Sequence, residues 1–249
     1  MKEEITKMTD KVLIFMHIPK TGGSTLNELF KKQYEQDEIL THFPLDRLSS
    51  EFNDLSSTKN DKIKGISGHY NFGVHEYINK PFSYFSMVRH PVDRVVSLYY
   101  FLSSSPGYAR YEELKGMTLE EFVTENKQAN NHQTLFFSGN GTFDLVLAKK
   151  NLETHFPVVG VTDMFNESVF LMKKEFNWKY TEYKKVNVTP KRPSLKEIPN
   201  SILKIIEENN RLDMELYKYV KERLTHQLEL LSSEEHREIQ QNREERHKK

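Results

Sequence analysis

A short apolar run that ends in a glycine-rich turn constrains the fold of this chain more than any other feature. Val12–Met16 is wholly apolar, too short to span a membrane and of the right length for a buried strand. The turn 19–25 (PKTGGST) follows, and then Leu26, Leu29 and Phe30 recur at helical spacing. The stretch therefore predicts a strand, a tight turn and a helix.

The turn has the composition of an anion site. Its two glycines let the backbone adopt unusual dihedral angles and approach a ligand closely. The helix that follows presents free N–H groups and the positive end of its dipole. Lys20 adds a full charge, and Thr21, Ser24 and Thr25 add hydroxyl groups. This composition favours a bound phosphate group; the alternative is an ordinary turn in which Ser24 or Thr25 caps the helix.

The position of the lysine separates this turn from the ATP-binding loops. A Walker A loop reads GxxxxGK[ST], with its lysine after the glycines. Here Lys20 precedes both glycines, and the Walker A string occurs nowhere in the chain. The sequence therefore disfavours a standard ATPase or GTPase.

Composition limits the other classes of function. The chain has 249 residues, of which 37% are hydrophobic and 29% charged, which suits one α/β domain with long solvated helices around it. Lysine plus arginine and aspartate plus glutamate both number 36, so the zero net charge argues against nonspecific nucleic-acid binding. The absence of cysteine excludes a disulfide framework and a thiolate metal site.

The sequence carries no signal for a membrane or for secretion. It contains no apolar stretch of about 18 residues, and the charged start MKEEITKMTD lacks the apolar region of a signal peptide. We therefore expect a cytoplasmic protein that does not span a membrane.

Apolar runs alternate with helical patterns along the chain. They predict strands at Val12–Met16, Ile63–Gly68, Phe82–Val88 and Phe156–Val161, with helices between them. This alternation predicts an α/β fold with a mostly parallel central sheet and helices on both of its faces. We assign residues 1–231 to this single domain.

The last part of the chain predicts a C-terminal helical extension. A long helix from Asn210 to Leu231 carries an apolar stripe that could form the interface of a homodimer. Residues 232–249 are almost wholly charged and polar, so we expect a frayed or disordered tail there.

A second motif, RHPVDRVVS, starts where the predicted strand Phe82–Val88 ends. Arg89 then lies at the carboxyl end of a strand, the edge where open α/β sheets bind ligands. Arg94 and Ser97 are three residues apart and share one face of the next helix. Arg89 and Ser97 could hold a second phosphate. The alternative is that Arg94 pairs with surface carboxylates and Ser97 is only a small helix residue.

Together the two motifs carry a family resemblance. HIPKTGGSTL resembles the 5′-phosphosulfate loop of the sulfotransferases that use 3′-phosphoadenosine 5′-phosphosulfate (PAPS), and RHPVDRVVSLYY resembles their 3′-phosphate motif. The spelling is most similar to the carbohydrate, Golgi-type branch, notably the heparan-sulfate 2-O- and 6-O-sulfotransferases. Looser similarity in GHYNF, NHQTLFFSG, VVGVTDMFNESVFLM and NVTPKRP extends it over residues 11–195. It implies a P-loop-like fold.

The resemblance also implies a mechanism and its residues. PAPS would donate a sulfuryl group to a hydroxyl, with PAP as product and no metal. Lys20 would neutralise the leaving phosphate, and His69, in GHYNF, would be the base; its alternative is a buried structural histidine. Implied cofactor-binding residues are Lys20, Thr21, Gly22, Gly23, Ser24, Thr25, Arg89, Ser97, Lys191 and Arg192. Lys191 and Arg192 could instead form a solvated basic turn.

Other polar residues near the motifs have weaker assignments. His17 is expected to pack against or bond to the turn, His90 and His132 are weaker base candidates, and His75 is expected at the surface. Gln133 could contact adenine or acceptor, or cap a loop.

The acceptor is inferred from what the chain lacks. Golgi-type relatives have a membrane anchor, lumenal targeting and cysteines, and none is evident here. We therefore expect a bacterial-type soluble enzyme whose acceptor is a glycan precursor, a glycolipid or a small hydroxylated metabolite. The alternatives are a small-molecule or nucleotide kinase of P-loop ancestry and a non-catalytic nucleotide-binding protein.

Overall fold

The structure is a computed structural model that describes residues 11–41, 62–108, 111–183 and 192–247. Its strands are β1 (Val12–Met16), β2 (Ile39–Thr41), β3 (Gly65–Gly68), β4 (Phe82–Val88) and β5 (Val158–Val161). Its α-helices are α2 (Gly23–Lys31), α5 (Pro91–Leu102), α6 (Tyr111–Leu114), α7 (Leu119–Glu125), α8 (His132–Ser138), α9 (Leu145–His155), α10 (Phe165–Phe176), α11 (Asn200–Asn209), α12 (Arg211–Glu229) and α13 (Ser233–His247). Short 3₁₀ turns include η3 (Thr162–Met164) and η4 (Leu195–Glu197).

In the described ranges the strands form one parallel sheet in the order β2-β3-β1-β4-β5. This confirms the α/β class and the mostly parallel sheet. Strands β2 and β3 lie on one side of β1, and β4 and β5 lie on the other. The direction in which successive strands are added to the sheet therefore reverses at β1. In open α/β sheets, ligands bind at the carboxyl ends of the strands beside such a reversal.

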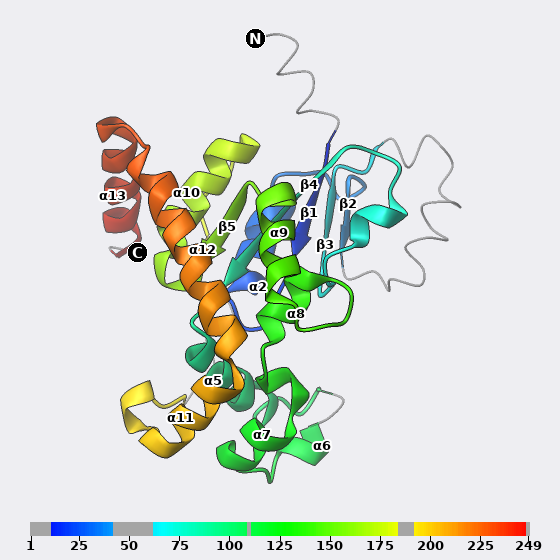
Figure 1. The fold of residues 1–249 in the computed structure, drawn as a ribbon. Helices are drawn as coiled ribbons and strands as arrows, with labels where there is room; N and C mark the ends of the chain where they lie inside the picture. Colours follow the sequence, from blue (N-terminus) through cyan, green and yellow to red (C-terminus); the bar gives the residue numbers. More distant parts are fainter. Residues whose placement is uncertain (1–10, 42–61, 109–110, 184–191, 248–249) are drawn as a thin grey trace.

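Helices cover both faces of the sheet, as neighbouring residues of β4 show. Successive side chains of a strand point to opposite faces. Phe85 packs on Phe30 of α2 and on Trp178, just after α10. Tyr84 packs on Phe156, just after α9. A second apolar cluster joins α5, α7 and α11, which gather at the lower end of the molecule in Figure 1.

The C-terminal segment differs from the prediction. Residues expected to be a disordered tail form α13, which lies beside α10 in Figure 1. Ile239 is 7% exposed, and the ion pairs Lys173–Glu238 and Lys174–Glu235 join the two helices. The prediction rested on the charged and polar composition of this segment, but one buried residue and ion pairs to a neighbouring helix attach it.

Two further predictions are corrected. The apolar stripe of α12, offered as a dimer interface, packs inside the chain, where Tyr217, Leu224 and Leu228 are buried and α12 contacts β5. His75, expected at the surface, is half-buried and stacks on Phe82.

No helix of the described ranges is long and apolar enough to cross a membrane.

Candidate active site

The glycine-rich turn between β1 and α2 has a backbone that only certain residues tolerate. Lys20 and Gly22 both have positive φ, 70° and 81°. A β carbon on Gly22 would also lie 3.2 Å from the ring of Phe165, at the start of α10. Thr21 is 1% exposed, and its hydroxyl donates to the carbonyl of Ile18 at 2.9 Å. The Thr21 hydroxyl therefore closes the turn, which leaves its backbone amide as the group that could face a ligand.

The start of α2 is suited to an anion. Its N-cap is Gly22, which has no side chain with which to cap this end of the helix. The first turn of a helix has N–H groups without intrahelical partners, and it carries the positive end of the helix dipole. An anion in the turn would supply the acceptor that this helix end lacks.

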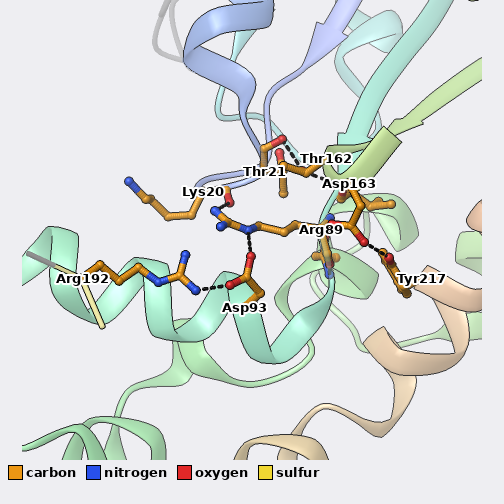
Figure 2. Close-up of polar contacts among 10 residues, drawn as sticks. Lys20, Thr21, Arg89, Asp93, Thr162, Asp163, Arg192 and Tyr217 are labelled. Atoms are coloured by element: carbon orange, nitrogen blue, oxygen red, sulfur yellow. Dashed lines mark hydrogen bonds and ion pairs between the residues drawn. The ribbon is translucent and has the colours of Figure 1, made fainter. Parts of the chain in front are cut away.

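A cluster of charged side chains lies beside the turn, at the carboxyl end of β4 (Figure 2). Asp93 of α5 is paired through one carboxylate oxygen with Nε of Arg89 and through the other with Nη2 of Arg192. Arg89 also donates from Nη1 to the carbonyl of Lys20 at 3.1 Å. One carboxylate thus holds two guanidinium groups next to the turn.

These charges shift one another's pKa values. Burial, with the neighbouring Arg89 and Arg192 acting in the same direction, lowers the pKa of Lys20 to about 8. Burial alone would raise the pKa of Asp93, but the two arginines more than offset it, so this pKa lies below its usual value. The Lys20 ammonium lies 4.0 Å from the ring centroid of Phe101 on α5. The site therefore holds positive charge that an anionic ligand would stabilise.

A buried glutamine fixes the backbone of Arg89. Gln133 of α8 accepts from the amide of Arg89 and donates to its carbonyl, both at 2.9 Å. Gln133 is 0% exposed, so the structure supports its structural role and not a contact with adenine or acceptor. Its own amide donates to Asp213 of α12 at 3.0 Å, and the amide and hydroxyl of Thr134 donate to the same carboxylate at 2.7 and 2.8 Å.

The surroundings of Arg94 and Ser97 differ from those expected if both were ordinary surface residues of a helix. Arg94 is fully buried, donates to the carbonyl of Gln128, and does not pair with surface carboxylates. Its Nε and Nη1 have no hydrogen-bond partner in the described part of the protein. Ser97 is 3% exposed on the same helix, so its contact with a phosphate stays a prediction.

A threonine and an aspartate after β5 also touch the site, although the sequence did not single them out. The hydroxyl of Thr162 lies 2.8 Å from the carbonyl of Thr21 and 3.0 Å from that of Val88, so it joins the turn to β4. Asp163 accepts from the hydroxyl of Tyr217 on α12 (Figure 2). Both residues belong to a strand end on the ligand-binding edge, which is the signal that could have identified them.

His69 lies on the other side of the turn from Arg89, because β3 and β4 flank β1. His69 directly follows β3 and is exposed, and its Nδ1 lies 2.8 Å from the carbonyl oxygen of His17. A carbonyl only accepts, so Nδ1 carries the proton and Nε2 of the neutral ring is the basic nitrogen. Burial lowers the pKa of His132 to about 3, with Arg94 and His69 acting in the same direction. His90 contacts the ring of Tyr217.

The structure therefore brings Lys20, Arg89 and Arg192 together at one edge, with His69 across the turn. Lys191 lies outside the described residues. Within those residues no group of three or more His, Asp or Glu side chains could hold a metal ion.

Comparison with known proteins identifies the family. The model described as "Sulfotransferase family" matches residues 4–220. The chain belongs to this sulfotransferase family. Human heparan-sulfate 6-O-sulfotransferase 2 is 24% identical over 302 aligned positions, which cover 96% of this chain and 49% of that protein. Human heparan sulfate 2-O-sulfotransferase 1 is 26% identical over 197 positions, covering 66% of this chain and 54% of that protein. The chain thus spans about half the length of both relatives.

A solved structure supports the fold of this family member. The crystal structure of mouse sulfotransferase SULT7A1 complexed with PAP matches with a TM-score of 0.50 at 14% identity. The match covers 85% of this chain and 88% of that one. At this identity the match shows the sulfotransferase fold and no more.

Proposed function

We propose that this chain transfers a sulfuryl group from PAPS to a hydroxyl group of a carbohydrate. The observation that carries the proposal is the convergence of Lys20, Arg89 and Arg192 beside the start of α2, whose N-cap Gly22 offers no side chain. PAPS carries anionic groups at both its 3′ and its 5′ positions, and the site offers cations at two neighbouring strand ends. The neighbour that was solved with PAP supports the same choice of nucleotide.

The residues at the site fit such a polyanion. Asp93 pairs with Arg89 and Arg192, and the carboxylate of Asp163 also acts on Arg89. Together with Lys20 the cluster has three cations and two carboxylates, so it keeps an excess of positive charge. Nε of Arg192 is buried and has no partner in the described residues, so it is a donor still available to an acceptor group. Burial is the main cause of the lowered pKa of Lys20, and repulsion by the two arginines acts in the same direction.

The residues of the turn would stabilise the charge that develops during transfer. When bound, PAPS supplies the sulfuryl group to an acceptor oxygen and leaves as PAP. Lys20 would neutralise the oxygen that gains charge as the S–O bond breaks. The first amides of α2 would hold the 5′-phosphate, because they point into the turn and move little during the reaction.

His69 would accept the proton of the acceptor hydroxyl. The His17 carbonyl binds Nδ1–H of His69, so the lone pair of the neutral ring is on Nε2. His69 is exposed, which allows an acceptor to approach it, whereas His132 is largely buried. The new S–O bond forms as the proton passes to Nε2, which converts the ring to imidazolium.

The class of acceptor rests on the relatives. Proteins named as heparan-sulfate 6-O- and 2-O-sulfotransferases match this chain, and they support a carbohydrate hydroxyl as the acceptor.

Two measurements test the proposal. Calorimetric titration should show binding of PAP in preference to ATP; tight ATP binding without PAP binding would refute the nucleotide assignment. Radiolabelled PAPS should then label a carbohydrate in a screen of hydroxylated acceptors. Lys20→Ala and His69→Ala should each abolish transfer, while His69→Ala still binds PAP. The exposed His226 of α12 provides a matched control, because His226→Ala should keep full activity.

Arg89 tests the second phosphate contact. Arg89→Ala should chiefly weaken PAP binding, since it removes a guanidinium that faces the turn. Unchanged PAP affinity in this variant would show that the 3′-phosphate binds elsewhere.

A further inference from the structure

The ring of His17 lies between the two halves of the candidate site. His17 directly follows β1 and is 7% exposed. Its ring stacks on Phe15, with centroids 5.3 Å apart and planes 10° apart, and it lies 4.3 Å from the ring of His69. The edge of the ring also lies against the turn, at Gly23.

The contact with Gly23 is unusually close. A β carbon on Gly23 would lie 1.9 Å from Cδ2 of His17 and 2.1 Å from its Nε2. The imidazole therefore fills the space that a side chain at the first residue of α2 would need. Any displacement of this ring changes the surroundings of the turn and of His69 together.

The backbone of His17 connects the same two parts. Its amide donates to the carbonyl of Gly68 at 3.0 Å, and its carbonyl accepts from Nδ1 of His69 at 2.8 Å. The hydrogen bond sets the tautomer of His69, but a single hydrogen bond still allows the ring to tilt about it. The face of the His17 ring supplies the second contact that fixes the plane of the base.

We propose that His17 is a positioning residue, whose ring holds the His69 imidazole in a fixed relation to the turn that binds the sulfuryl donor. The expected effect on catalysis rests on the proposed function, whereas the placement of the His69 ring by His17 is independent of it. His17 acts through the shape of its ring, because a flat ring suffices for the contacts with Phe15, Gly23 and His69.

Substitutions that keep or remove a flat ring separate this role from a general effect on folding. Every substitution keeps the backbone carbonyl that binds His69. His17→Phe keeps a ring on Phe15, so the turnover number kcat should stay within about threefold of the wild type. His17→Ala removes the ring, and kcat should fall on the order of 10- to 100-fold, the effect of a misplaced catalytic group. PAP affinity should change by less than about threefold in both, since the cations of the nucleotide site are untouched.

Two results would overturn the proposal: wild-type kcat in His17→Ala, or an equal loss of kcat in His17→Phe and His17→Ala. If His17→Ala does not fold, His17→Val takes its place, because a branched side chain suits the end of a strand and also lacks a ring.

Nitrogen NMR of the histidine rings tests the geometry without any activity. In the wild type and in His17→Phe, the His69 signals should report one tautomer, with the proton on Nδ1. In His17→Ala the hydrogen bond keeps this tautomer but the ring can tilt about it, so the His69 ring signals should broaden by exchange; sharp signals at the wild-type positions would also refute the proposal. If the wild type binds no PAP, the proposed function fails, while the NMR comparison still decides the role of His17.

Discussion

The buried carboxylate of Asp213 should be among the most sensitive positions in this protein. It is 0% exposed and accepts three hydrogen bonds, from Gln133 N, Thr134 N and Thr134 Oγ1. Asp213→Asn keeps the shape of the side chain but turns one acceptor into an NH₂ group. That group must face the N–H of Gln133 or of Thr134, so at least one buried donor loses its partner.

The cost follows from these contacts. An unsatisfied buried donor costs about 1–3 kcal/mol, and hydrogen bonds to a charged acceptor are worth about 1.5–3 kcal/mol against about 1 kcal/mol for neutral ones. The substitution also removes the negative charge that stabilises the charged form of the fully buried Arg94. We expect a loss of about 3 kcal/mol in the free energy of unfolding, or a fall of roughly 10 °C in Tm for a chain of this size.

Urea unfolding of Asp213→Asn and of Glu215→Gln measures this effect. Glu215 is an exposed carboxylate on the same helix, so its substitution should change stability by less than about 0.5 kcal/mol. If the free energy of unfolding of Asp213→Asn falls by less than about 1 kcal/mol, the reasoning is refuted, because the three charge-assisted hydrogen bonds then contribute little to stability. PAP affinity should also fall in this variant, since Gln133 transmits any shift to the backbone of Arg89.

Three further predictions concern charge at and near the site. Asp93→Ala should weaken PAP binding by about tenfold in calorimetry, because Arg89 and Arg192 lose the carboxylate that orders them; equal or tighter binding would contradict this. PAP affinity should decline as the pH rises through about 8, where Lys20 loses its proton, by up to about tenfold per pH unit, and Lys20→Ala should remove that decline. Because the folded pKa of His132, about 3, lies below its unfolded value, its contribution to stability is complete above pH 6.5 and is lost as the pH falls towards 3. Urea unfolding of the wild type should show that the free energy of unfolding falls by about 2 kcal/mol between pH 7 and pH 5. This fall should be smaller in His132→Phe and the same as in the wild type in His226→Gln. Equal falls in the wild type and both variants would contradict the prediction.

Local patterns predicted much of the fold. The strands β1 and β4 have the predicted bounds, since each is a compact apolar run followed by a clear turn. The edge strand β2, Ile39–Thr41, escaped prediction because three residues carry no periodicity. The helix α13 escaped because its attachment depends on residues of α10 that lie about 60 positions earlier in the chain.

The candidate site was predictable where its residues sit next to strand ends. Lys20 and Arg89 were identified in this way, but the ion pair of Arg89 with Asp93 was not. The contact of Gln133 with Asp213, by contrast, joins residues 80 positions apart. Only the packing of α12 against α8 creates this contact. No local sequence pattern could therefore have shown that Gln133 has a buried structural role and does not cap a loop or contact a ligand.

The attachment of α13 has a consequence for the molecule's response to salt. The helix is joined to α10 by the ion pairs of Lys173 and Lys174, whose side chains are 38% and 54% exposed, and by the buried Ile239. Solvated ion pairs weaken as ionic strength rises, whereas burial of an apolar side chain does not. Amide hydrogens of α13 should therefore exchange faster in high salt while those of the sheet keep their protection. Opening of α13 would then be a separate local equilibrium, adjustable by ionic strength without unfolding the sheet.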